Sequence, residues 1–180
     1  MACGWAFIFA AVSFYWAAGG TVGSETIGPA ITGLAHDPVF IAILWLTGAL
    51  KVVAGLLALA FVQPWGRMIP RWMLLTAAWI AFVIMALYEG AASWVQHGLM
   101  AAGGIGIPSG LGTTALYWHL LLWDPWWLAG GILFGALALS YQRRSREPGA
   151  SVAHGWGLFH ASQLHPRRWR GADGRGNAPL

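Results

Sequence analysis

Three ionisable side chains and one histidine stand within or beside apolar stretches, where they could carry chemistry: Lys51, Glu89, His119 and Asp124. Lys51 falls near the middle of the apolar run from Val39 to Val62. An ammonium that faces lipid there costs at least about 2.5 to 3.5 kcal/mol. We therefore expect Lys51 to face another helix, either as a proton-exchanging or anion-binding group, or as a structural ion pair or snorkelling side chain.

Glu89 and Asp124 are the candidate partners of Lys51, since one closes an apolar stretch and the other opens one. Each carboxylate also has a simpler interpretation, because Glu89 could be a solvated helix end and Asp124 a helix N-cap. His119 could join the two carboxylates in a proton relay, or it could be a hydrogen-bonded histidine at the membrane surface. None of these residues is predicted to be catalytic.

A metal site needs its ligands brought together, and the sequence shows no such grouping. His36, His97 and His119 fall in segments expected on one side of the membrane, but their spacing matches no local ligand motif. Gly103 to Gly106 is not a phosphate loop, because no Lys follows it. The sequence therefore predicts no metal and no cofactor, and it leans against an enzyme.

The composition is that of an integral membrane protein. Hydrophobic residues make up 58% of the 180 residues and charged residues only 9%. Thirteen Trp residues are expected to concentrate where hydrocarbon meets the headgroups. The net charge of +4 is explained by bases on one side of the membrane, and we expect no nucleic-acid partner. The single cysteine, Cys3, excludes an internal disulfide.

The predicted fold is all-α, an integral membrane four-helix transmembrane bundle over residues 1–141, with a disordered basic tail over residues 142–180. The first helix could instead be a signal peptide, but no Lys or Arg precedes it and bulky Trp16 stands at the would-be cleavage region. Asp-Pro pairs at Asp37 and Asp124 are typical helix starts. The four predicted helices are residues 4–18, 38–62, 72–89 and 124–141.

Between the third and fourth helices, the glycine-rich stretch from Ala91 to Thr114 is expected to be a loop with short helical pieces. Residues 113–123 could form a helix lying at the membrane interface before Asp124 starts the last crossing. The alternative is one long kinked helix. The order of elements places Arg67 and Arg71 in the connection that follows the second helix.

The basic residues predict the orientation. Seven Arg residues lie from Arg143 to Arg175, and the two loops on the other side contain no Lys or Arg. By the positive-inside rule both termini face the cytoplasm, and the protein is a multi-pass protein of the cell membrane. The run Arg167 to Arg170 is expected to contact anionic lipid headgroups, or to be solvated without a partner.

Two motifs carry a resemblance to a known family. SFYWAAGGTVG, from Ser13 to Gly23, closes the first predicted helix, and LWDPWWLAGG, from Leu122 to Gly131, opens the last. They resemble the domain-of-unknown-function family 3995, small bacterial membrane proteins expected to have four helices. The resemblance covers about Gly4 to Tyr141 and implies a fold and a location but no activity. The positions that match its pattern are Tyr15, Trp16, Gly19, Gly20, Asp124, Pro125 and Trp126.

Three kinds of function remain open. The first is a non-enzymatic accessory or structural membrane protein, with membrane lipids and a protein partner or a second copy of itself, the latter through the small-residue face at Gly48 and Gly55. The second is a small transporter or proton-coupled carrier that uses Lys51 with Glu89 or Asp124. The third is an enzyme acting on lipid or quinone at an outer mouth. The mouth would be lined by Tyr15, Trp16, Glu25, Glu89, His119 and Asp124, although aromatic anchoring and helix caps explain the same residues.

Overall fold

The computed structural model describes residues 1–144, and every regular element in that range is a helix. The all-α prediction is therefore confirmed for this part of the chain. Met1 to Gln142 forms one compact unit, whose fold is given below. Residues 145–180, which contain most of the predicted basic tail, lie outside the described residues.

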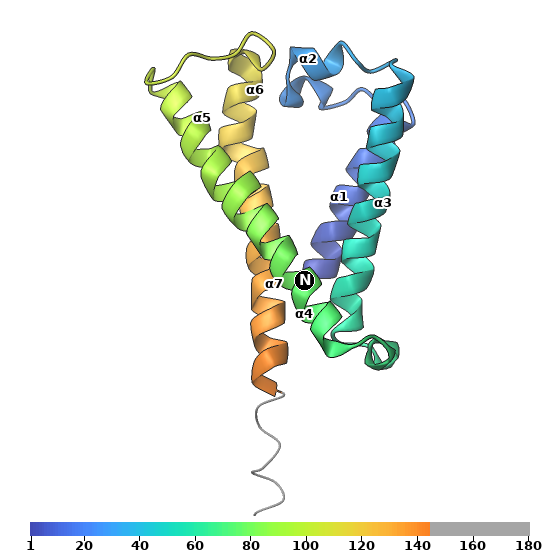
Figure 1. Ribbon diagram of the computed structural model, residues 1–180. Helices are drawn as coiled ribbons and strands as arrows, with labels where there is room; N and C mark the ends of the chain where they lie inside the picture. The colour runs from blue at the N-terminus through green and yellow to red at the C-terminus, as the bar shows by residue number, and fades with distance from the viewer. Residues whose placement is uncertain (145–180) are drawn as a thin grey trace, which may run out of the picture. The chain divides into compact units, whose positions relative to one another are not determined.

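The first pair of helices is α1 (Ala2–Ala17) and α3 (Pro38–Ala60), which pack side by side (Figure 1). Two short helices, η1 (Ser24–Ile27) and α2 (Pro29–Thr32), lie in the connection between them. Asp37 caps α3, because its carboxylate accepts hydrogen bonds from the backbone N–H groups of Val39 and Phe40, both at 2.9 Å.

The small residues of α3 serve this pairing. A Cβ added at Gly48 would lie 2.6 Å from the ring of Phe14, and one added at Gly55 would lie 2.6 Å from the ring of Phe7. Both phenylalanines belong to α1, so the glycines let the two helices approach closely. The face that could have joined two copies of the chain is therefore occupied inside one copy.

The second half consists of two long helical stretches. After the turn η2 (Pro64–Met68), α4 (Arg71–Phe82), the π-helical η3 (Val83–Ala92) and α5 (Ser93–Ala101) run on as one helix. A second continuous helix follows the connection at residues 102–111. It consists of α6 (Gly112–Trp118), the π-helical η4 (His119–Trp123) and α7 (Asp124–Arg144). Both π-helical segments therefore lie inside long helices.

The predicted end of the third helix at Glu89 is wrong, and the loop predicted from Ala91 to Thr114 is confirmed only for residues 102–111. The helix continues to Ala101 and passes through Gly90. A Cβ at Gly90 would lie 2.8 Å from the Cα of Leu128 in α7, so this glycine allows a close helix contact. The packing outweighs the cost of glycine in a helix, which is only about 1 kcal/mol.

The predicted start of the fourth helix at Asp124 is also wrong. Asp124 has helical dihedral angles, φ −65° and ψ −47°, and follows the helical segment His119–Trp123. The long-helix alternative is therefore the one observed. Pro125 lacks an N–H group and cannot make the ordinary bond to the carbonyl of Leu121. The π-helical turn immediately before Pro125 accommodates this gap.

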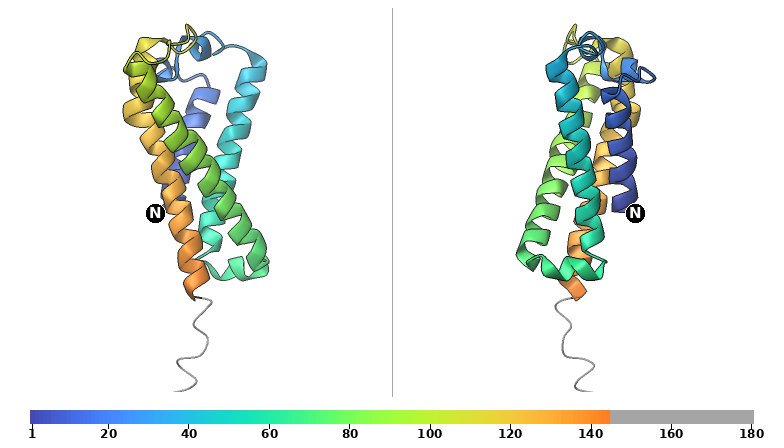
Figure 2. Two further views of the ribbon diagram at one scale, coloured as in Figure 1. Left: turned by 60° about the vertical axis from the view of Figure 1, so that its left-hand side comes forward. Right: turned by 90° about the vertical axis from the view of Figure 1, so that its right-hand side faces the viewer.

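The helices share an apolar core. One buried cluster brings together α1, α3, η3 and α7, and a second joins α3, α4 and α7 below it. The two views in Figure 2 show the long helices running alongside one another. Three helical stretches are long and apolar enough to cross a membrane, Pro38–Ala60, Arg71–Ala101 and Gly112–Arg144, and α1 is a shorter apolar helix.

Candidate functional site

The densest polar group in the described residues is a cluster of His97, His119 and Asp124. Nδ1 of His97 lies 2.7 Å from Oδ2 of Asp124, the distance of a hydrogen bond from the ring N–H to the carboxylate. Nδ1 of His119 lies 3.8 Å from Oδ1 of the same carboxylate. The two imidazole rings are 4.9 Å apart between centroids. We call these three residues the His–His–Asp cluster.

The cluster depends on the π-helical turn of η4. In an α-helix, residues five apart are about 140° apart around the axis, so His119 and Asp124 would point away from each other. In a π-helix the backbone bonds run from i to i+5, so residues five apart lie on neighbouring turns of the same face. The segment His119–Trp123 therefore turns His119 toward Asp124. His97 reaches the same carboxylate from α5.

Burial makes the cluster energetically distinctive. The side chain of Asp124 is 2% exposed, whereas those of His97 and His119 are 14% and 25% exposed. A carboxylate that loses its water needs compensating hydrogen bonds or positive charge, because desolvation otherwise costs several kcal/mol. The two imidazoles supply the polar contacts. His97, His119 and Asp124 each offer one ligand atom, and these three atoms lie within 4.8 Å of one another. The group could therefore hold a metal ion.

Lys51 faces another helix, as predicted, but its contacts are not with the candidate partners Glu89 and Asp124. Its ammonium donates a hydrogen bond to Oγ of Ser13 at 2.6 Å and lies 3.8 Å from the ring centroid of Phe9. Both partners belong to α1, and the contact with Phe9 is a cation–π interaction. Within residues 1–144 Lys51 forms no ion pair with Glu89 or Asp124. The side chain of Lys51 therefore links α3 to α1 through a hydrogen bond and a cation–π contact.

Within residues 1–144, no hydrogen bond or ion pair joins Glu89 to either group of contacts. It is a half-buried residue of the π-helical segment η3, inside the long helix from Arg71 to Ala101 and not at a helix end. The interpretation of Glu89 as a solvated helix end is therefore wrong. The reason is the same continuation of the helix through Gly90.

The residues predicted to line one outer mouth do not form a single group in the structure. Tyr15 and Trp16 hold the turn after α1, since the Tyr15 hydroxyl accepts from Val22 N–H at 3.2 Å and Trp16 Nε1 donates to the Val22 carbonyl at 3.0 Å. The ring of Trp16 also lies 5.8 Å from that of Trp123, which directly precedes Asp124. Trp123 in turn donates to Thr26 Oγ1 at 3.1 Å.

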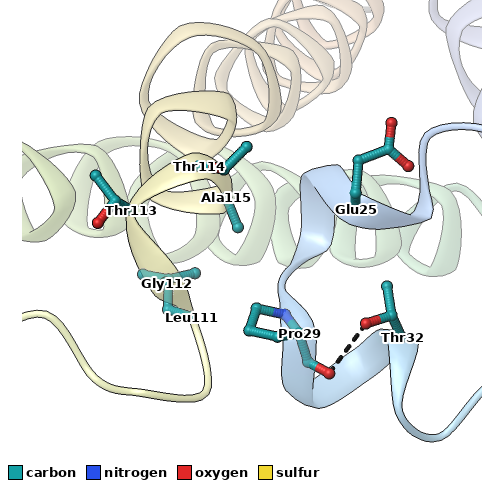
Figure 3. Close-up of a pocket in the computed structure, with 8 residues that line it drawn as sticks. All are labelled: Glu25, Pro29, Thr32, Leu111, Gly112, Thr113, Thr114 and Ala115. Carbon is teal, nitrogen blue, oxygen red and sulfur yellow. Dashed lines mark hydrogen bonds between the residues drawn. The ribbon is translucent and has the colours of Figure 1, made fainter.

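Glu25 lines a cavity of about 320 Å³ between the η1–α2 segment and the start of α6 (Figure 3). The other lining residues are Pro29, Thr32, Leu111, Gly112, Thr113, Thr114 and Ala115. The hydroxyl of Thr32 donates a hydrogen bond to the carbonyl of Pro29 at 3.0 Å, within the same short helix α2. The structure therefore brings His119 and Asp124 together, whereas Glu25 belongs to this separate cavity.

The sequence did not single out Ser13, and it gave His97 only as one of three histidines whose spacing matches no ligand motif. His97 is 27 residues from Asp124, and Ser13 is 38 residues from Lys51. No periodicity of a single helix links residues so far apart. The one available signal was the π-helical spacing of five between His119 and Asp124, with a proline directly after it.

A comparison with protein-family models gives one match, described as "Protein of unknown function (DUF3995)", over residues 6–134. The matched range includes most of α1, all of α3 and the whole His–His–Asp cluster. No curated protein and no solved structure matches the chain. The family match covers more than half of the chain and confirms the resemblance carried by the Ser13–Gly23 and Leu122–Gly131 motifs. The chain belongs to the DUF3995 family of proteins of unknown function.

Proposed function

We propose that this protein is a multi-pass membrane protein that crosses the bilayer four times and acts as a non-enzymatic accessory or structural component of the membrane. The observation that carries the proposal is the contact of Lys51 with Ser13 and Phe9, because it uses the charge inside the apolar helices to join α1 to α3. An intramembrane charge used in this way stabilises the fold.

Exposed apolar surface supports the membrane location. Along α3, most of the large apolar side chains are exposed on the outside of the molecule, where lipid would cover them. α1 has 16 residues and spans about 24 Å, so as a fourth crossing it is shorter than about 30 Å of hydrocarbon and needs local thinning of the bilayer. The exposed side chains of α3 are Val39, Ile43, Trp45, Leu46, Leu50, Val53 and Leu56.

The distribution of bases supports the orientation. The connections at residues 18–37 and 102–111 lie at one end of the helices (Figure 1) and contain no Lys or Arg. The connection from Phe61 to Pro70 at the other end contains Arg67 and is followed by Arg71. By the positive-inside rule the second end, and with it both termini, face the cytoplasm of the bacterial cell.

Native mass spectrometry of the protein extracted in mild detergent tests the accessory role. We expect either a homo-oligomer or a second protein at fixed stoichiometry, and the same composition in two unrelated detergents. A bare monomer in both detergents would contradict the proposal. The retained lipids are read in the same spectra.

A small carrier is the second candidate, favoured by the presence of Glu89 and Asp124 inside long apolar helices. It predicts solute or proton flux in proteoliposomes that Lys51→Met abolishes. The accessory role predicts equal flux in vesicles with the wild type, with Lys51→Met and without protein. Flux that depends on Lys51 would replace the first proposal with the second.

A further inference from the structure

We propose that His97, His119 and Asp124 form a binding site for one divalent first-row transition-metal ion. Their ligand atoms come from two separate helical stretches and lie within 4.8 Å of one another. This inference does not depend on the accessory role, since a structural membrane protein and a carrier could both hold such an ion.

The donor set fits this class of metal. Two imidazole nitrogens and one carboxylate oxygen suit zinc and iron, whereas Mg²⁺ and Ca²⁺ prefer oxygen ligands. Zinc binds these atoms at about 2.0 to 2.2 Å, which puts neighbouring ligand atoms of a tetrahedral site about 3.3 Å apart. The observed separations of 2.7 Å and 3.8 Å to the Asp124 oxygens lie on either side of that value. These two distances run to different oxygens of Asp124, so binding of one ion would require the side chains to rotate towards a common centre.

The charge of the cluster also favours a cation. Asp124 is 2% exposed, and within residues 1–144 its polar side-chain partners are the two histidines. With both imidazoles neutral, the buried carboxylate carries an uncompensated negative charge, which is costly in apolar surroundings. A dication bound to all three groups compensates that charge. Three protein ligands leave at least one position for water or another small ligand.

The backbone gives an independent reason to read the cluster as a site. π-helical turns are rare and occur frequently at functional sites. The turn His119–Trp123 is the feature that brings His119 and Asp124 onto one face. The partial exposure of the two histidine side chains, 14% and 25%, gives an ion access without unfolding of the helices.

Zinc binding by the full chain tests the proposal. The protein is purified in detergent without a polyhistidine tag, stripped with a chelator, exposed to Zn²⁺ and measured for bound zinc and for affinity in competition with a chromogenic chelator. We expect one zinc ion per wild-type chain. His119→Gln and Asp124→Asn should each weaken binding by about tenfold or more.

Two control variants isolate the cluster. His36→Gln changes an exposed histidine outside it, and replacement of His154, His160 and His165 by Gln removes the remaining histidines of the C-terminal segment. Both controls should keep the wild-type affinity. His119→Gln removes a partly exposed ring, so circular dichroism should show wild-type helix content even if Asp124→Asn fails to fold.

Absence of stoichiometric zinc on the folded wild type would overturn the proposal and leave His97 and Asp124 as a hydrogen-bonded pair. Wild-type affinity in folded His119→Gln would overturn it equally. Loss of binding in the triple variant of the C-terminal histidines, with the cluster intact, would place the metal elsewhere and contradict the assignment.

Discussion

At the scale of single residues, two of the ionisable groups inside the apolar helices, Lys51 and Asp124, have polar partners on neighbouring helical segments. Lys51 contacts Ser13 and Phe9, and Asp124 contacts His97 and His119. The sequence could identify Lys51 and Asp124, because a charge in an apolar run is costly wherever it lies. It could not identify Ser13 or His97, because their positions depend on how separate helices pack.

The contact between Lys51 and Ser13 makes a prediction about stability. Ser13 is 2% exposed, so Ser13→Ala leaves the ammonium without its hydrogen-bond partner and should lower the free energy of unfolding by about 1.5 to 3 kcal/mol. The double variant Ser13→Ala, Lys51→Met removes both polar partners and should recover most of that loss. Unfolding by SDS in mixed micelles measures both values. A double variant as unstable as Ser13→Ala would show that the hydrogen bond is not what stabilises this contact.

At the scale of elements, the same dipeptide has two outcomes. Asp37 and Pro38 start α3, with Asp37 as its N-cap, whereas Asp124 and Pro125 lie inside a continuous helical stretch. The residues before Asp37 include Gly33, but those before Asp124 are the helix-compatible run from Leu116 to Trp123. A local start signal therefore predicts a helix boundary only where the preceding chain also stops being helical.

The glycines inside the long helices explain the other error of boundary prediction. Gly90 directly follows the helix end predicted at Glu89, and glycine is a poor helix former, yet Gly90 and Gly131 both mark close contacts between η3 and α7. Their role becomes visible only when the opposing backbone is in place. Fold class and the apolar stretches could thus be predicted from sequence, but the helix ends at Ala101 and Gly112 could not.

Gly131→Ala tests this close contact. A Cβ at Gly131 would overlap the backbone and Cβ of Ala86, so the helices must separate, and the variant should lose about 1 to 3 kcal/mol of stability. Gly98→Ala is the matched control in α5, where the nearest atom to the added Cβ is Leu120 Cδ1 at 4.0 Å. The control should be neutral or more stable by up to about 1 kcal/mol. Equal stability of the two variants in SDS titration would contradict close packing at Gly131.

At the scale of the whole molecule, the described part of the chain is an all-helical unit whose three longest stretches suit a membrane, joined by the shorter α1. Composition alone predicted this class, because 58% hydrophobic residues with 9% charged residues do not suit a water-soluble domain. We propose four crossings from the lengths of the apolar helices, and the orientation from the placement of basic residues. These two points form the central claim about the protein.

Labelling of single cysteines in intact cells tests that claim most directly. In a Cys3→Ser background, Ala35→Cys, Ser109→Cys and Gln63→Cys each place one thiol at an exposed position in a different connection. With a membrane-impermeant maleimide, we predict labelling of the first two variants in intact cells and of Gln63→Cys only after lysis. Labelling of Gln63→Cys in intact cells, or opposite behaviour of Ala35→Cys and Ser109→Cys, would contradict the four-crossing arrangement.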